Sequence, residues 1–274
     1  MEPSEIIIEP GMGIKHYWRD LWRYRELFYF LAWRDILVRY KQTTIGIAWS
    51  VLRPFLTMVA FTIVFSKLAR LPSGGVPYPI LVYAAMLPWQ FFANSLSEAS
   101  NSLIDNSNLL TKVYFPRLIV PTSSVIVSLV DFCISLCILA LLMLWYGFAP
   151  DWRILILPVF FLFAFIASFG CSLWLAALNV KYRDFRHVVP FIVQFGLYIS
   201  PVGFSSSIVP ERWRLIYSLN PMVGVIDGFR WGLLGGKTQI YLNGMLVSAL
   251  VAFVIFLFGL RYFRSMERNF ADVI

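Results

Sequence analysis

Long apolar runs alternate with short polar segments along the whole chain. A helix that crosses the hydrocarbon core of a bilayer needs about 20 consecutive apolar residues. Five runs satisfy this length, a sixth is short and interrupted by Gly196, Pro201 and Gly203, and a seventh is too short to span. The five long runs are 45–65, 78–98, 118–146, 154–179 and 240–261. The short interrupted run is 188–204, and the run that is too short to span is 222–235. The pattern predicts an all-α integral membrane protein with six spanning helices.

The stretch between the fifth and sixth predicted spans, 199–235, is broken by glycine and proline and carries Asp227 and Arg230. Irregular backbone at membrane depth is tolerated only where it is buried in protein or lines a wet cavity. We therefore expect re-entrant or surface-lying helices here, turned away from lipid.

Composition excludes a soluble fold. Residues of the AVILMFWYC set make up 59% of the 274-residue chain and DEKR only 14%, whereas soluble domains carry about 25% charged residues. The mean hydropathy is +0.72. The net charge of +8 comes from Lys and Arg residues that flank the apolar runs. Most of them lie beside the termini and on the loops of the same side, which predicts that both termini are cytoplasmic.

These patterns predict three regions. Residues 1–44 form a cytoplasmic N-terminus, 45–265 a six-span membrane domain and 266–274 a cytoplasmic tail. Within the first, 14–29 places aromatic and basic residues on opposite faces of a helix, as in Trp18, Trp22 and Arg19. The pattern is typical of a helix lying along a membrane interface, and a helix packed on another subunit is the alternative.

Sequence signatures of catalysis are absent. Gly236-Lys237-Thr238 is not a P-loop, because that motif needs a glycine five residues before the Gly-Lys pair and Trp231 stands there. The three cysteines contain no CxxC and their number is odd, which implies neither a disulfide framework nor a zinc site. We expect small buried side chains there, no metal or cofactor, and no enzymatic activity in this chain.

Arg53 and Asp131 are the charged residues that lie deep inside predicted spans, away from their ends. A charged side chain at mid-membrane costs at least about 2.5–3.5 kcal/mol and should face protein or water. We therefore hypothesise an Arg53–Asp131 ion pair. An ion-coupled lipid or small-molecule carrier is the alternative function, because such carriers place ionisable groups at this depth. The absence of a chain of acidic groups from the spans argues against it. A membrane glycosyltransferase would need an Asp-rich site, which the cytoplasmic segments do not offer.

Three segments have a more particular pattern. The first is Arg39-Tyr40-Lys41-Gln42 followed by Gly46, Trp49, Leu52 and Pro54. The second is Leu87-Pro88-Trp89-Gln90-Phe91-Phe92, then Asn94, Ser102, Asn106, and the run from Leu109 through Lys112-Val113-Tyr114-Phe115-Pro116-Arg117 to Pro121. The third is Tyr182-Arg183-Asp184, then Ser200-Pro201-Val202, Pro210, Asn220-Pro221 and Gly228-Phe229-Arg230.

In this order, and over nearly the whole chain, these segments closely resemble the membrane subunit of bacterial polysaccharide ABC exporters. This is the type-2 ABC permease family, which exports O antigen, capsule or wall teichoic acid. The chain looks most similar to the O-antigen permeases, and teichoic acid permeases share most of the same motifs.

The resemblance implies a homodimer in the bacterial inner membrane, associated with two copies of a cytoplasmic ABC ATPase that binds ATP and Mg. The cargo it implies is a polysaccharide on a lipid diphosphate, moved from the cytoplasmic to the outer leaflet. An ATPase on a separate chain would explain the missing P-loop.

The resemblance also assigns roles to particular segments. The loop 104–117 corresponds to the coupling helix, a short helix that fits a cleft in the ATPase. Asp105, Asn106 or Ser107 could cap it, its apolar face would fill the cleft, and Pro116 would end it. The expected coupling residues are Asp105, Asn106, Leu109, Leu110, Lys112, Val113 and Tyr114.

In the family the channel lies between two protomers and is lined by the first and fifth spans. Aromatic rings suit a sliding sugar chain, although many aromatic residues in a membrane protein belong to the core or the interface. The expected glycan-channel residues are Trp49, Phe55, Phe61, Phe191, Phe195 and Tyr198.

Two further sets complete the prediction. A lipid diphosphate needs Arg or Lys near the cytoplasmic interface, where basic residues also have a general orienting role. Its candidates are Arg34, Arg39, Lys41 and Arg53. Short helices between the last two spans close the outer mouth in the family. The expected outer-gate residues are Pro201, Gly203, Phe204 and Pro221.

Overall fold

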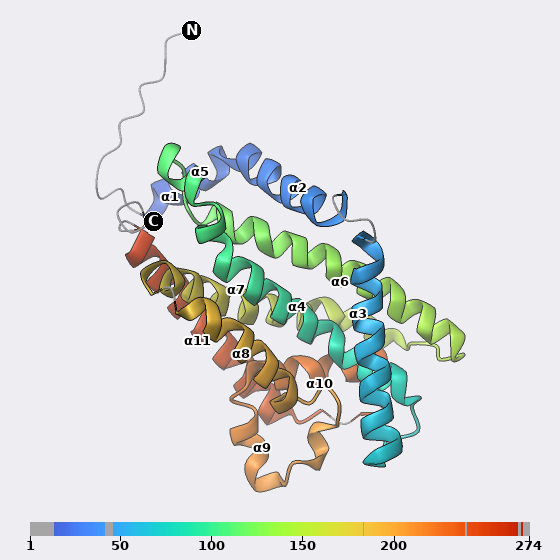
Figure 1. Ribbon diagram of the computed structural model, residues 1–274. Helices are drawn as coiled ribbons and strands as arrows, with labels where there is room; N and C mark the ends of the chain where they lie inside the picture. Colours follow the sequence, from blue (N-terminus) through green and yellow to red (C-terminus); the bar gives the residue numbers. More distant parts are fainter. Residues whose placement is uncertain (1–13, 42–45, 183, 239, 268–269, 271–274) are drawn as a thin grey trace.

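The computed structural model describes residues 14–41, 46–182, 184–238, 240–267 and 270. All regular elements within these ranges are helices, which confirms the predicted all-α class (Figure 1). The predicted 14–29 helix is present as α1 (Ile14–Arg23) and α2 (Arg25–Lys41), and α2 continues well past the predicted end. Leu31 and Ala32 of α2 are buried, and α2 packs along α6 (Ile119–Trp145).

Four helical segments are long and apolar enough to cross a membrane: Val51–Leu68, Ile119–Trp145, Trp152–Lys181 and Leu242–Met266. The first combines α3 (Gly46–Phe61) with η1 (Thr62–Leu68), the third combines η2 (Trp152–Ile156) with α7 (Leu157–Lys181), and the last is α11. The short interrupted run at 188–204 forms α8 (Phe185–Ile199), whose 15 residues extend about 22 Å against a hydrocarbon core of about 30 Å. The six-span count therefore stays a prediction.

The centre of the bundle is α4 (Tyr78–Asp105), which contacts α3, α6, α7, α8 and α10 (Pro221–Leu233). The predicted span ended at residue 98, but the helix continues to Asp105, where small polar side chains bond to carbonyls of the same helix, as Asn101 Nδ2 does to Ser97 over 2.8 Å and Ser102 Oγ does to Ala99 over 2.8 Å. The Ser172 hydroxyl donates to the Ser95 carbonyl over 3.1 Å, and Asn179 Nδ2 donates to the Ser100 carbonyl over 3.1 Å. These bonds join α4 to α7.

Glycine allows α7 and α11 to pack in close contact. A Cβ atom built on Gly259 would lie 2.1 Å from the carbonyl oxygen of Gly170, and one on Gly170 would lie 2.5 Å from the Cα of Phe256. Small residues at such crossings allow van der Waals packing between backbones, the main source of helix association in a membrane.

The region between α8 and α11 contains η3 (Ser206–Ile208), α9 (Glu211–Tyr217) and α10. Most of α10 is buried against α4, α7 and α11, as expected for a segment that avoids lipid. Figure 1 shows α9 at the end of the molecule opposite α1 and α5 (Ser107–Lys112). At the α5 end, the Arg117 amide donates to Glu267 Oε1 over 2.8 Å. The beginning and end of the described chain thus share one end of the bundle.

The expectation of buried cysteines is wrong for two of the three. Cys133 and Cys137 are exposed free thiols on α6, and Cys171 is half-buried on α7. Other helices of the described chain do not cover the face of α6 that carries Cys133 and Cys137. The apolar residues on this face therefore indicate a lipid-facing surface rather than a core.

Candidate functional site

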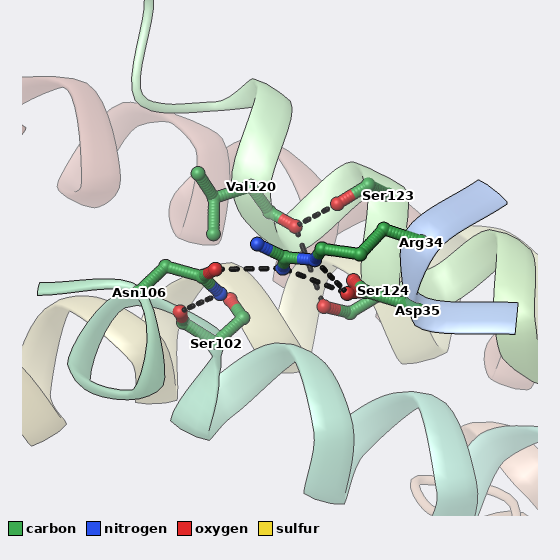
Figure 2. A network of polar contacts seen from close by, with 7 residues as sticks. All are labelled: Arg34, Asp35, Ser102, Asn106, Val120, Ser123 and Ser124. Atoms are coloured by element: carbon green, nitrogen blue, oxygen red, sulfur yellow. Dashed lines mark hydrogen bonds and ion pairs between the residues drawn. The ribbon is translucent and has the colours of Figure 1, made fainter. Parts of the chain in front are cut away.

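The predicted coupling segment folds as expected into a short helix, α5, but its beginning is stabilised differently. Asn106 stands at the N-cap position without a capping hydrogen bond from its side chain. Its Oδ1 accepts from Nη2 of Arg34 over 2.7 Å, and its Nδ2 donates to the Ser102 carbonyl over 2.8 Å (Figure 2). Arg34 also donates twice to Asp35 Oδ1, over 2.7 and 2.9 Å. This network fixes α2 to the junction between α4 and α5.

The apolar residues of the coupling segment have two different roles. Leu110 is buried and Leu109 packs partly against the core, so these two side chains attach α5 to its own chain. Val113 is 49% exposed and Tyr114 66% exposed. Together with the exposed residues Asp105 and Lys112, they leave a mixed apolar and charged surface at this end of the bundle.

The predicted Arg53–Asp131 pair is wrong, because a residue of α2 takes the place of Arg53. Nη2 of Arg39 lies 2.8 Å from Oδ2 of Asp131, and Nη1 of the same guanidinium lies 3.1 Å from Oε1 of Glu98. The Tyr40 hydroxyl donates to Asp131, and Asn94 Nδ2 donates to it over 3.4 Å. Arg53 is exposed on α3.

The reason lies in the packing of α2. Because α2 runs along α6, it carries Arg39 and Tyr40 to the buried carboxylate from outside the predicted spans. Asp131 therefore connects α2, α4 and α6 at one point. We call Arg39, Tyr40, Asn94, Glu98 and Asp131 the Asp131 cluster.

The four predicted lipid-diphosphate residues thus have different surroundings. Arg34 and Arg39 hold carboxylates of their own chain, although about a third of each side chain is exposed. Lys41 and Arg53 are exposed. The assignment of these four residues to a diphosphate stays a prediction.

Five of the six predicted channel residues form exposed aromatic surfaces on α3 and α8. Those surfaces consist of Trp49, Phe55, Phe191, Phe195 and Tyr198. The rings of Phe191 and Phe195 lie 4.7 Å apart. Phe61 packs edge-on against Phe65, with ring centroids 5.5 Å apart. Both helices contact α4 and lie on either side of it (Figure 1).

The predicted outer-gate residues form a compact turn after α8. Pro201 and Gly203 are buried, Phe204 is half-buried, and Pro221 begins α10. The Tyr78 hydroxyl of α4 donates to the Gly203 carbonyl over 2.8 Å. A Cβ atom on Gly203 would lie 2.2 Å from Cε2 of Phe65, so glycine is required for this contact with η1.

Sequence reasoning gave Arg230 no role, yet it organises this turn. Its guanidinium is 1% exposed. It donates to the carbonyls of Leu81 over 3.2 Å, Val202 over 2.8 Å and Phe204 over 2.6 Å. One buried cation on α10 therefore holds α4 and both ends of the turn together. The sequence does contain a signal for this role. An arginine within an apolar run must find hydrogen-bond partners inside the protein.

The long apolar helices are those of a multi-pass membrane protein, and comparison with known families gives the class of this protein. The model of the ABC-2 type transporter family matches residues 26–234. The chain belongs to this family.

Particular relatives are O-antigen permeases. The chain is 32% identical over 215 residues to the O-antigen export system permease protein RfbA of Myxococcus xanthus, covering 77% of this chain and 82% of the relative. It is 25% and 26% identical to two proteins of the same name from Klebsiella pneumoniae, each match covering 91% of this chain and 95% of the relative. These similarities confirm the predicted resemblance.

Proposed function

We propose that this chain is the transmembrane subunit of an ATP-driven exporter of lipid diphosphate-linked polysaccharide, most simply O antigen. Two copies would enclose the channel, and two copies of a separate ABC ATPase would supply ATP hydrolysis. The observation that carries this proposal is the match to O-antigen export permeases over about nine-tenths of the chain. The exposed aromatic faces of α3 and α8 support the position of the channel.

Those aromatic faces would have a use in transport. Because α3 belongs to a segment long and apolar enough to cross a membrane, its exposed rings would face lipid unless a second protomer covers them. If two protomers meet through α3 and α8, the rings of Trp49, Phe191 and Tyr198 would line the space between them. Flat rings bind sugars by stacking without fixing them by many directional hydrogen bonds, which suits a polymer that must slide.

Coupling would run through α5. The exposed residues Val113 and Tyr114, directly after α5, would supply an apolar contact for an ATPase cleft, and Lys112, the last residue of α5, would supply a charge beside it. Displacement of α5 would act on α2 through the hydrogen bond between Asn106 and Arg34. Because α2 also holds Asp131 through Arg39, the same displacement would reach α4 and α6.

The test replaces Phe191 and Phe195 together by alanine in the native host, with Phe253 and Phe258 as the matched control. The control pair is similarly exposed but lies on α11. The readouts are surface polysaccharide, intracellular lipid-linked polysaccharide and the amount of permease in the membrane.

We expect the α8 variant to lose surface polysaccharide and to accumulate the lipid-linked form at normal permease levels, while the α11 variant exports normally. Full export by the α8 variant would refute the aromatic channel. Unchanged surface polysaccharide after deletion of the whole gene would refute the exporter function itself.

A further inference from the structure

A large apolar groove separates α6 from α7 and is not part of the transport path proposed above. Its volume is about 960 Å³, within the range of about 300–1,000 Å³ typical of ligand pockets. Almost all of its lining is apolar, and it includes Phe132 of α6, Phe161 of α7 and Phe229 of α10. The turn at 147–150 closes one end.

The groove has the length of one membrane leaflet. Its residues on α6 recur at helical spacing from Leu129 to Leu144, a distance of about 22 Å at 1.5 Å per residue. Half of a bilayer, polar region included, is about 20–22 Å thick. The groove runs from the middle of α6 to its end at the α6–α7 turn, so its two ends match the midplane and the surface of one leaflet.

The groove opens toward the surroundings of two membrane-spanning helices. Both α6 and α7 are long and apolar enough to cross a membrane, and Leu136 and Leu144 in the groove wall are exposed. Apolar cavities of this kind do not hold water, and empty space forfeits dispersion contacts on every wall. At this depth the membrane supplies hydrocarbon chains.

Cations lie at the surface end of the groove. Nζ of Lys237 is 5.0 Å from the ring centroid of Phe148, a groove residue, and the Arg153 guanidinium is 5.1 Å from the ring of Trp231. Asp151 lies 3.9 Å from Arg153, and the two side chains lie against Gly235 and Gly236, directly before Lys237. The net charge of these three side chains is positive. Nε of Arg153 is buried and lacks a hydrogen-bond acceptor within the described parts of the chain.

We propose that this groove binds one phospholipid with an anionic headgroup. Its acyl chains lie along α6 between Leu129 and Leu144, and its phosphate is held by Lys237 and Arg153. Phosphate oxygens are strong acceptors for both side chains. The proposal does not depend on what the permease carries.

The first experiment measures retained lipid. The full-length protein is reconstituted in vesicles of equal parts phosphatidylglycerol and phosphatidylcholine, extracted in mild detergent and analysed by native mass spectrometry. Ala140→Trp fills the groove, whereas Leu141→Trp, the next residue on α6, adds the same ring outside it. We expect one phosphatidylglycerol per chain in wild-type and Leu141→Trp protein, and at least a tenfold loss in Ala140→Trp. Equal retention by both variants would overturn the proposal.

The headgroup is tested with Lys237→Gln, and Lys67→Gln is the control because Lys67 is an exposed lysine outside the groove. One basic residue near an anionic lipid surface changes binding by about fivefold. We expect the preference for phosphatidylglycerol over phosphatidylcholine to fall by about that factor only in Lys237→Gln. An unchanged preference would overturn the assignment of an anionic headgroup.

A second measurement needs no bulky substitution. Cys133 lines the groove, and Cys137, one turn further along α6, does not. Each is kept as the single cysteine and coupled to a benzophenone, then photolysed in the same vesicles. We expect a phosphatidylglycerol adduct at Cys133 in clear excess over Cys137. A crosslink from Cys133 to a second copy of the chain, or equal lipid adducts at both positions, would overturn the proposal.

Discussion

The Asp131 cluster is predicted to stabilise the contact between α2 and α6 through its central ion pair. The perturbation is Arg39→Gln, Asp131→Asn and the double variant. Arg39→Gln leaves the Asp131 carboxylate without its cation, and Asp131→Asn leaves Arg39 with Glu98 alone, whereas the double change removes both charges of the central pair. We therefore expect two destabilising single variants and a double variant whose loss is smaller than their sum.

The magnitude follows from the geometry. At 2.8 Å, the Coulomb attraction at an effective dielectric constant of about 20 is about 6 kcal/mol, an upper bound before desolvation and side-chain ordering oppose it. The Arg39 side chain is 30% exposed and that of Asp131 11%, which places the pair between a surface and a buried ion pair. A coupling free energy of about 1–3 kcal/mol is expected for residues in such contact.

The assay is thermal unfolding in detergent, where 1 kcal/mol corresponds to a Tm change of about 2–4 °C for a chain of this size. Arg53→Gln combined with Asp131→Asn is the control cycle, and its effects should add within about 0.5 kcal/mol. Additive losses for Arg39 and Asp131, or coupling between Arg53 and Asp131, would refute the reasoning.

Three further predictions concern other contacts. Asn106→Ala should lower the glycan exported per ATP hydrolysed in a reconstituted exporter, because it removes the hydrogen bond between α2 and the start of α5. Asn243→Ala, an exposed change on α11, should not. Gly259→Ala should lower the Tm and the yield of monodisperse protein, with an overpacking cost of about 1–3 kcal/mol, and an unchanged Tm would contradict the close α7–α11 contact. Arg230→Met should lower the Tm, because each buried carbonyl left without a donor costs about 1–3 kcal/mol, whereas Arg212→Met on the exposed face of α9 should leave the Tm unchanged.

The helices of this protein could be predicted from its sequence because the membrane imposes the pattern. A spanning helix must be a long apolar run, and α6, α7 and α11 appear close to their predicted positions. The end of α4 was missed because serine and asparagine residues there resemble a loop in the sequence. Their side chains bond instead to carbonyls of the helix itself, as Ser102 Oγ does to Ala99, and α7 adds the bond from Asn179 to the Ser100 carbonyl.

The tertiary partners of the polar residues could not be predicted. Asp131 was correctly recognised as needing a cation, but composition could not distinguish Arg39 from Arg53, since the choice depends on how α2 packs along α6. Asn106 lies at the predicted start of the short helix α5, while its bond to Arg34 crosses 72 residues of sequence and has no local signature. The partners of Arg230 could not be predicted either, because its three carbonyl acceptors lie in two distant parts of the chain.

The central claim is that a separate ATPase engages α5, and crosslinking mass spectrometry tests it most directly. Native membranes are treated with an amine-reactive crosslinker, and the chain is purified in mild detergent. Lys112 lies on α5, shortly before the start of α6, and Lys237 lies against Phe148, shortly after the end of α6 and thus at the other end of the bundle. The account predicts a stoichiometric P-loop ATPase crosslinked to Lys112 and not to Lys237. A homo-oligomer without any ATPase would contradict it and favour the ion-coupled carrier.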